Sequence, residues 1–566
     1  MKEREHEPKE REEKERERTP IWRDWLVALS LANLCFLQAW RRVLDPASEF
    51  YYYHWKRFPG WAALVAIVLN VLILSALFSI VALLARRSGR ASVLRIAQAS
   101  LLFASLFALN NIRLQFESLL MPNLVKSLTR GGVAVISVLL VALALALVAH
   151  YGLRRTTRAV ITLLLILSPL AVVNFAHATW LAAKYSNSLE DKPTAPSLAA
   201  RNADAPRVLW LIFDEFDQRV AFAERPSGLM LPELDRLRRE SLFAVNAYPP
   251  AGDTLPSLPA LITGRLVSGV RQIRQDELEI SFQGEEKPVG WSEQPNVFSR
   301  ARALGYNTAL VGWYHPYCRL LSRELTVCSW ESGNVITRPE RWSVGQNMLN
   351  QIRTLLMSVS ILQRTRIGRQ IDKRIFRKRN LEELKRGRIS LQRAIGEKAE
   401  GLVNRTDLGL IMLHYPVPHP PGIYERATGA YSFKREQSYL DNLALVDRVL
   451  GDLRRALEAS GTWDATTVLV SSDHYLRSEV RQTQASQLSQ EDLDILTDRA
   501  EHRIPFMLKM ARQREAMMYE SPFNTVLTHD LLLAVLRGEL SNAQDASLWL
   551  DRHRTIGENF SHIKSP

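Results

Sequence analysis

The sequence has few cysteines, with three in 566 residues. That number excludes a disulfide-rich scaffold and a zinc site built from thiolates. Cys35 lies inside an apolar run, where we expect it to be inert. Cys318 and Cys328 stand in the more polar part of the chain. If that part lies in an oxidising compartment they close a small loop, and otherwise they are two free thiols.

Apolar residues are almost missing from residues 1–21, where Lys and Arg alternate with Glu. Such a segment cannot bury enough surface to order itself, so we predict a charged cytoplasmic tail. The formal net charge of the chain is +14. The basic residues cluster beside apolar segments and in one insert, which favours a membrane surface over a nucleic acid as the partner.

Long apolar runs are confined to residues 22–182. Most of them approach the roughly 20 residues that a bilayer core demands, so we predict a bundle of about five transmembrane helices. The runs are 25–40, 61–84, 93–109, 133–148 and 160–180. The short turns 86–90 and 154–158 are rich in arginine. By the positive-inside rule these turns and the N-terminus are cytoplasmic, and the chain after residue 180 lies outside.

A proline-containing polar linker, residues 183–206, leads to a domain at 207–545 and a C-terminal tail at 546–566. Continuous apolar runs of strand length recur in this domain, at 207–213, 308–311, 408–413 and 467–470. Helical patterns such as 231–242 and 439–457 separate them. Continuous runs are typical of strands covered on both faces, and alternation with helices predicts an α/β domain with a mostly parallel sheet.

Acidic and imidazole side chains follow four of these runs. They are Asp214, Glu215, His315, His414, His419, Asp473 and His474. Each one alone is as readily explained as a hydrogen-bonded core residue. Packing does not require them at four successive strand ends, however, and ligands of parallel sheets gather at the carboxyl ends of the strands. Carboxylates and imidazoles predict a divalent cation there.

Thr254 stands in a proline-flanked turn within the stretch 252–264, just before an apolar run that predicts the first turns of a helix. Free backbone N–H groups and the macrodipole favour negative charge at a helix N-terminus. A hydroxyl placed there can attack a phosphate or sulfate. The alternative is ordinary N-capping by Thr254 or Ser257.

Together these motifs resemble the alkaline phosphatase superfamily, in particular its sulfatase-like membrane branch, which includes lipoteichoic acid synthases and lipid A phosphoethanolamine transferases. Thr254-x-Pro-Ser-x-Pro-Ala-Leu-Ile-Thr-Gly is similar to the sulfatase signature Cys/Ser-x-Pro-Ser-Arg-x-x-x-x-Thr-Gly. The segment from Gly305 to His315 resembles Gly-Tyr-x-Thr…Gly-Lys-Trp-His. The resemblance covers about residues 207–545 and implies an extracytoplasmic α/β/α sulfatase-like domain after the transmembrane bundle.

The resemblance also implies roles for individual residues. The ligands of one divalent metal would be Asp214, Thr254, Asp473 and His474, with Glu215 as a further ligand. Zn²⁺ is the first expectation, and Mn²⁺, Mg²⁺ and Ca²⁺ are alternatives. Thr254 would be the nucleophile. The family's substrate-contacting histidines correspond to His315, His419 and His502, which would contact phosphate, protonate the leaving oxygen, or hold a second metal.

Four positions depart from the sulfatase pattern. Sulfatases convert Cys or Ser to formylglycine, an aldehyde that Thr254 cannot form. Leu258 stands where an arginine normally follows Pro-Ser, and Trp313 replaces the lysine before Trp-His. Tyr475 follows the Asp-His pair in place of the usual glycine. Hydrolysis of sulfate esters by the usual route is therefore not expected.

An insert at 346–393 carries apolar residues at helical spacing among many basic ones. This pattern fits an amphipathic helix in the lipid headgroup region. It fits equally a helix pair packed on the domain with a solvated basic face.

The resemblance implies an enzyme of a bacterial inner membrane. The expected reaction moves a phosphoethanolamine or phosphoglycerol group from a phospholipid donor to an envelope glycan or lipid acceptor. One alternative is a phosphodiesterase or phosphatase of the same superfamily, with water as acceptor. A remote alternative is a non-catalytic membrane scaffold. No nucleic acid is expected as a partner.

Overall fold

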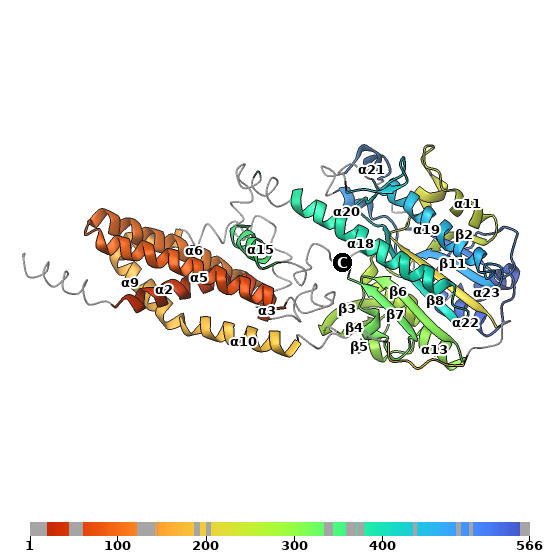
Figure 1. Cartoon of the computed structure of the whole chain (residues 1–566), viewed down its shortest axis with the longest axis horizontal. Coiled ribbons are helices and arrows are strands. Elements are labelled where there is room, and N and C mark those ends of the chain that lie inside the picture. The colour runs from red at the N-terminus through yellow and green to blue at the C-terminus, as the bar shows by residue number, and fades with distance from the viewer. Residues whose placement is uncertain are drawn as a thin grey trace, which may run out of the picture. The chain divides into compact units, whose positions relative to one another are not determined.

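The computed structural model (Figure 1) describes residues 20–44, 60–120, 142–143, 145–185, 193–199, 205–274, 276–332, 343–357, 370, 378–433, 438–482, 488–496 and 502–554. The chain divides into two compact units. The helical unit comprises Met1–Glu49, Arg57–Leu189 and Arg338–Arg377. The sheet unit comprises Phe50–Lys56, Glu190–Thr337 and Lys378–Pro566.

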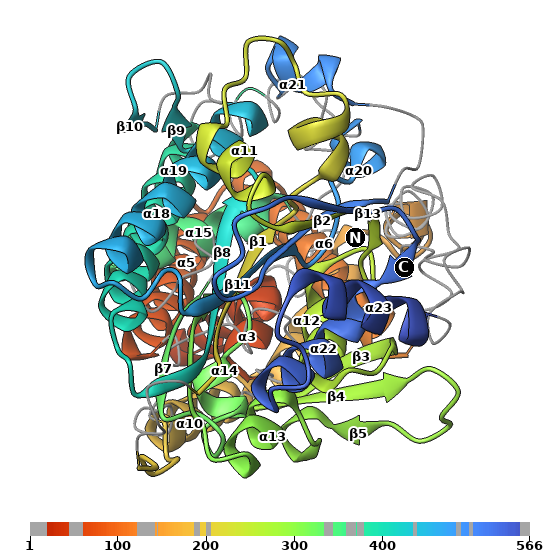
Figure 2. The ribbon, with the colours of Figure 1, turned by 90° about the vertical axis from the view of Figure 1, so that its right-hand side faces the viewer.

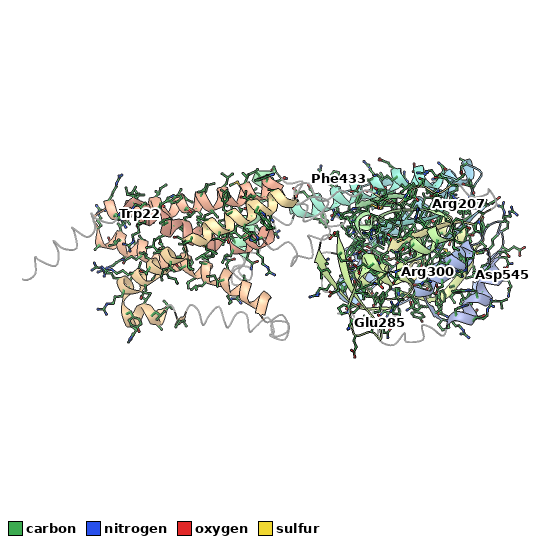
Figure 3. All side chains as sticks on the ribbon, turned by 90° about the horizontal axis from the view of Figure 1, so that it is seen from below. Trp22, Arg207, Glu285, Arg300, Phe433 and Asp545 are labelled. Carbon is green, nitrogen blue, oxygen red and sulfur yellow. A yellow bond between two sulfur atoms is a disulfide. The ribbon has the colours of Figure 1, made fainter. Side chains whose placement is uncertain are left out.

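The helical unit contains three stretches that are long and apolar enough to cross a membrane, counted over the described residues: Trp61–Arg87, Ala91–Leu114 and Leu153–Ala183. Its helices are α2 (Ile21–Cys35), α3 (Leu37–Leu44), α5 (Gly60–Arg87), α6 (Ala91–Leu120), α9 (Leu153–Leu167), α10 (Pro169–Tyr185) and α15 (Val344–Met357). The chain is therefore a candidate membrane protein. Trp22, at the start of α2, is exposed (Figure 3), as an aromatic residue at a membrane interface would be.

The prediction of five spans is wrong for the part of the chain that the structure describes. The expected first span is interrupted at Phe36, between α2 and α3. At 1.5 Å per residue, the 15 residues of α2 reach only about 22 Å, short of a hydrocarbon core of about 30 Å. Much of α2 is instead buried among the other helices of its unit. The expected span at 133–148 falls mostly outside the described residues.

A mixed sheet forms the centre of the other unit (Figures 1 and 2), with strand order β13-β2-β12-β11-β1-β8-β6-β7 and with β14 paired to β2. The strands from β11 to β7 in this order are parallel, and β12 pairs antiparallel with both β11 and β2. The bounds are β1 (Arg207–Asp214), β2 (Leu242–Tyr248), β6 (Asn307–Trp313), β7 (Val327–Glu331), β8 (Leu408–Pro418), β11 (Thr466–Ser472), β12 (Ile504–Lys509), β13 (Met517–Tyr519) and β14 (Phe523–Asn524).

Two apolar cores lie on the two faces of this sheet. Every residue of β1, β6, β8 and β11 is buried, which explains why these strands read as continuous apolar runs. Helices supplying the first core are α12 (Thr254–Thr263), α13 (Val297–Ala303), α14 (Tyr317–Leu320), α22 (Thr528–Leu536) and α23 (Ala543–His553). Those supplying the second are α11 (Pro232–Arg238), α18 (Lys378–Val403) and α19 (Tyr439–Ala459).

Smaller elements complete the sheet unit. They are the antiparallel sheet β3 (Val267–Arg274), β4 (Glu277–Phe282) and β5 (Val289–Gly290), the pair β9 (Tyr424–Glu425) and β10 (Ala430–Tyr431), the helices α20 (Ser478–Gln482) and α21 (Gln490–Asp494), the short π-helix η2 (Arg219–Ala223), and the 3-10 helices η3 (Trp291–Glu293) and η8 (Thr525–Leu527). A disulfide joins Cys318 to Cys328, the first of the two alternatives that the sequence left open.

Three expectations for this unit need correction. The helix expected at 231–242 ends at Arg238, because the apolar residues from Leu242 onward belong to β2. The tail expected from residue 546 is helical as far as His553, and Ala546 and Leu550 are buried in the core. The insert does not form one helix pair. Its first helix, α15, belongs to the helical unit, whereas α18 packs on the sheet.

Candidate metal centre

The register of two neighbouring strands brings the first acidic residues together. Parallel pairing of β1 with β11 places Phe213 opposite Ser472. Asp214, which ends β1, therefore lies beside Asp473, which follows β11. Both strands are buried along their whole length, and Asp214 and Asp473 at their carboxyl ends are buried as well. The order of the sheet thus explains how residues far apart in the sequence meet.

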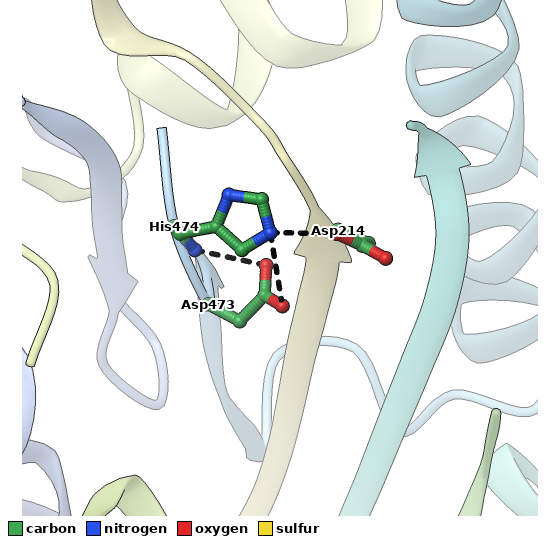
Figure 4. Close-up of side chains that lie close together, drawn as sticks. All are labelled: Asp214, Asp473 and His474. Carbon is green, nitrogen blue, oxygen red and sulfur yellow. Dashed lines mark hydrogen bonds and ion pairs between the residues drawn. The ribbon is translucent and has the colours of Figure 1, made fainter. Parts of the chain in front are cut away.

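Asp214, Asp473 and His474 form a buried group whose ligand atoms all lie within 4.8 Å of one another (Figure 4). His474 Nε2 is 3.2 Å from Asp214 Oδ1 and 3.8 Å from Asp473 Oδ2. His474 Nδ1 lies 2.9 Å from the carbonyl oxygen of Tyr475. Because a carbonyl only accepts hydrogen bonds, Nδ1 carries a proton, and Nε2 is the atom that faces the two carboxylates and that would bind a metal.

The chemistry of the group fits a divalent cation. Asp214 Oδ2 and Asp473 Oδ2 are buried, and neither has a hydrogen-bond partner in the described part of the chain. Asp473 Oδ1, in contrast, accepts hydrogen bonds from the backbone N–H groups of Glu215 and His474. Unpartnered carboxylate oxygens are costly to bury, and a cation between them would remove that cost. Two carboxylates and an imidazole are ligands that Zn²⁺ and Mn²⁺ accept.

Thr254 reaches the same point from the N-terminus of α12. Its Oγ1 lies 3.4 Å from His474 Nε2 and 3.5 Å from Asp214 Oδ1. The N-cap of α12 is Asp253, whose side chain accepts a hydrogen bond from the N–H of Leu255. The alternative reading, in which Thr254 or Ser257 caps the helix, is therefore wrong, and the Thr254 hydroxyl faces the acidic group.

The charges of the group influence one another strongly. Burial favours the neutral form of Asp214, but the nearby His419 and His474 outweigh it and lower the pKa of Asp214. Burial and the neighbouring charge of Asp214 raise the pKa of Asp473. Burial disfavours the imidazolium of His474, yet Asp473 and Asp214 outweigh it and raise its pKa to about 9. Without a cation, the imidazolium itself is the positive charge between the carboxylates.

Glu215, expected as a further ligand, faces arginines instead. One of its carboxylate oxygens accepts from the Arg481 guanidinium and the other from the backbone N–H of Arg477. Burial favours its neutral form, but the charge of Arg481 outweighs that and lowers the pKa of Glu215 to about 2. Glu215 has φ 63°, in the left-handed region that non-glycine residues rarely adopt. His419 Nε2 is 3.8 Å from a carboxylate oxygen of Glu215.

Each of the three predicted catalytic histidines contacts a different neighbour. His315 follows β6, and its Nε2 is 3.4 Å from the carbonyl oxygen of Thr254, so that it touches the backbone of the threonine. His419 Nδ1 lies 2.6 Å from the carbonyl oxygen of Pro420, and burial lowers the pKa of His419 to about 4. His502 stacks on Tyr475, the residue that follows His474, with ring centroids 4.1 Å apart.

His414 is a structural neighbour of the site. Its Nδ1 is 2.9 Å from the hydroxyl oxygen of Tyr317, and burial lowers its pKa to about 4. Tyr317 was not singled out from the sequence. Tyr317 lies on α14 and His414 on β8, and no local sequence pattern relates these two segments.

Arg388 is a second residue that the sequence did not single out. It lies on α18, is 4% exposed, and stacks on Trp313 with its guanidinium carbon 4.2 Å from the ring centroid. Trp313 in turn lies 6.1 Å, between ring centroids, from His419. Trp313 itself stands where the sulfatase pattern has a lysine. The insert contains many basic residues, and nothing in the sequence distinguished Arg388 from the others.

A model of the sulfatase family matches residues 206–536. Similar solved structures are distant. They include Ps i-CgsB in complex with k-i-k-neocarrahexaose (16% identity, TM-score 0.40, covering 61% of this chain and 75% of that one), the PsFucS1 sulfatase from Pseudoalteromonas sp. (14%, 0.37, 59% and 69%) and the lipoteichoic acid synthase LtaP from Listeria monocytogenes (12%, 0.35, 60% and 75%). No match was found among curated proteins.

Proposed function

Because the chain belongs to the sulfatase family, we propose that it is a metal-dependent membrane transferase with Thr254 as nucleophile. It moves a phosphoethanolamine or phosphoglycerol group from a phospholipid to an envelope glycan or lipid acceptor. One observation carries the proposal: Thr254 Oγ1 lies within 3.5 Å of both Asp214 and His474, in a buried group that fits a cation. A threonine in this position suits transfer of a phospho-group, because it cannot become formylglycine.

Asp214, Asp473, His474 and Thr254 would hold the cation. When bound, it would neutralise the phosphate oxygens and lower the pKa of the hydroxyl. In the first step, Thr254 Oγ1 forms a bond to phosphorus and the bond from phosphorus to the lipid alcohol oxygen breaks. The proton lost by Thr254 ends on that alcohol. The N-terminus of α12 adds partial positive charge beside the phosphate.

In the second step, an acceptor hydroxyl attacks phosphorus and the bond to Thr254 breaks. We assign the proton transfer to His419. Its Nδ1 proton is held by the Pro420 carbonyl, so Nε2 is the basic atom, and its low pKa keeps the ring neutral near pH 7. Nε2 takes the proton of the acceptor and returns it to the Thr254 oxygen. His315, through the Thr254 carbonyl, positions the nucleophile.

Two observations support an enzyme of the bacterial inner membrane with its catalytic domain outside the cytoplasm. The helical unit has three candidate membrane helices in its described part. The sheet unit carries the Cys318–Cys328 disulfide, and disulfides persist in oxidising compartments such as the periplasm. A catalytic domain beside the outer leaflet would meet phospholipid headgroups directly.

The test follows a phospholipid labelled in its headgroup, given to the purified full-length protein in lipid nanodiscs with lipid A and envelope glycans present. We expect the label to reach an alcohol acceptor. Thr254→Ala should abolish transfer. Thr263→Ala, a matched change on the same helix whose hydroxyl bonds the Pro259 carbonyl, should preserve it. Label that reaches only water would show a hydrolase and refute transfer.

A further inference from the structure

The helix α15 belongs to the helical unit although it lies within the insert of the sheet unit's sequence. It packs against α5, and both helices are labelled in Figures 1 and 2. Asn70 of α5 donates hydrogen bonds to Gln351 Oε1, at 2.8 Å, and to the carbonyl oxygen of Met348, at 3.2 Å. Gln351 donates to the carbonyl oxygen of Ala63, at 3.1 Å. Two amides thus tie α15 to α5.

These amides lie inside an apolar unit. Asn70 is 4% exposed and Gln351 is 9% exposed. One turn after Gln351, Leu355 packs on a core that includes Leu31 and Leu34 of α2. An unpaired amide in such surroundings is costly, so the mutual hydrogen bonds specify where α15 docks. A helix that merely rested on a water-exposed surface would not need them.

The position of Asn70 gives the depth of the contact. Asn70 is nine residues after Trp61, where the candidate span Trp61–Arg87 begins. At 1.5 Å per residue this is about 14 Å along the helix, close to half of a hydrocarbon core of about 30 Å. Gln351, bonded to both Ala63 and Asn70, therefore lies between the edge and the middle of the span.

A neighbouring face of α15, turned by roughly 100° or more around the helix axis from Gln351, exposes apolar side chains. Leu349 is 52% exposed, Ile352 36% and Leu356 40%, at a spacing that places them on one helix face. The candidate span beside it exposes the same kind of side chain, including Leu69, Leu72 and Ile73. Both α5 and α15 of this unit therefore expose apolar side chains. Water would leave these side chains unfavourably solvated, whereas lipid acyl chains would match them.

We propose that α15 is embedded in the bilayer beside α5, with Leu349, Ile352 and Leu356 against lipid acyl chains. The insert is then a membrane-anchoring element of its own, and the buried Asn70–Gln351 pair is its anchor point. This proposal concerns the helical unit alone and does not depend on the reaction at Thr254.

The test measures depth with nitroxide labels on the full-length protein, after Cys35→Ala removes the free thiol. Single labels at Leu349→Cys, Ile352→Cys and Leu356→Cys are studied in vesicles of phosphatidylethanolamine and phosphatidylglycerol. The quantity measured is the accessibility of each label to oxygen relative to a water-soluble nickel chelate. Leu77→Cys on α5 and Met518→Cys on β13 are matched controls, since both residues are apolar and more than half exposed.

We expect the three labels on α15 to favour oxygen several-fold, as Leu77→Cys does. Values like those of Met518→Cys would place the face in water and overturn the proposal. Low access to both reagents with spin–spin broadening would show a second copy of the chain on this face, which also overturns it.

The anchor point has its own measurement. Asn70→Ala should increase the mobility of a label at Ile352→Cys. Asn174→Ala, which removes an amide bonded to Asn33 instead, should not. Equal mobility in the two variants would contradict the role of the Asn70–Gln351 pair.

Discussion

The Thr254 hydroxyl oxygen lies 3.4 Å from His474 Nε2, although the two residues are 220 positions apart in the chain. A helix N-terminus delivers the first and the end of a central strand delivers the second. The same imidazole nitrogen faces Asp214 and Asp473. A hydroxyl placed among buried carboxylates is a poor nucleophile unless positive charge is added, which is why the metal is central to the predictions below.

Replacing Asp473 by Asn should weaken metal binding by at least about tenfold, because a neutral amide oxygen is a poorer ligand for a divalent cation than a carboxylate. The measurement is the metal content of the purified full-length protein after dialysis against a metal buffer. Asp235→Asn, which removes a carboxylate paired with Arg225, is the control and should keep its metal. Equal metal content in both variants would contradict the assignment.

Metal binding should release protons. In the metal-free protein the pKa of His474 is about 9, so the ring is protonated at pH 7. A metal ligand must be neutral imidazole, so binding at pH 7 should expel about one proton from this residue. Affinity should therefore rise with pH until about pH 9 and level off above it. Calorimetry in two buffers of different ionisation enthalpy measures the release, and a binding heat that is independent of the buffer would refute it.

Arg388→Ala should raise the KM for an anionic phospholipid donor by about tenfold, with a smaller change in kcat, because a positive charge close enough to His419 to lower its pKa is lost. Arg388→Lys should recover part of the loss. Arg386→Ala is the matched control, since Arg386 stands on the same helix but stacks on Phe433. A KM that is the same in the Arg388 and Arg386 variants would remove Arg388 from the site.

Gly264→Ala should destabilise the domain more than Gly461→Ala. Both glycines have positive φ, 72° and 70°, so alanine is strained at either position by about 1–2 kcal/mol. A Cβ at Gly264 would also lie 2.7 Å from the imidazole of His529, whereas nothing lies within 4 Å at Gly461. The melting temperature of each variant measures the difference. Equal melting temperatures would contradict the close packing at the end of α12.

The central strands could be predicted because a strand buried on both faces has a continuous run of apolar residues. The runs at 207–213, 308–311, 408–413 and 467–470 all lie inside observed strands. The helix expected at 439–457 is observed at Tyr439–Ala459. The acidic and imidazole residues that follow these strands could then be predicted to gather at the carboxyl end of the sheet. The actual approach of Asp214 to His474 depends on strand order, which the sequence alone did not specify.

Other features had no local signal. The break at Phe36 contains neither proline nor glycine, so the first apolar run was read as a single span. Asp253 rather than Thr254 caps α12, a choice set by backbone geometry before the helix. The pairing of Asn70 with Gln351 and the stacking of Arg388 on Trp313 join distant segments. Such contacts depend on the packed structure and not on the pattern of either segment.

Mass spectrometry of the protein quenched during turnover of a phospholipid donor tests the central claim most directly. The peptide that contains Thr254 should carry the mass of a phosphoethanolamine or phosphoglycerol group on that threonine, and the modification should disappear when an acceptor is added. Product formation with Thr254 unmodified at every time point would contradict the account.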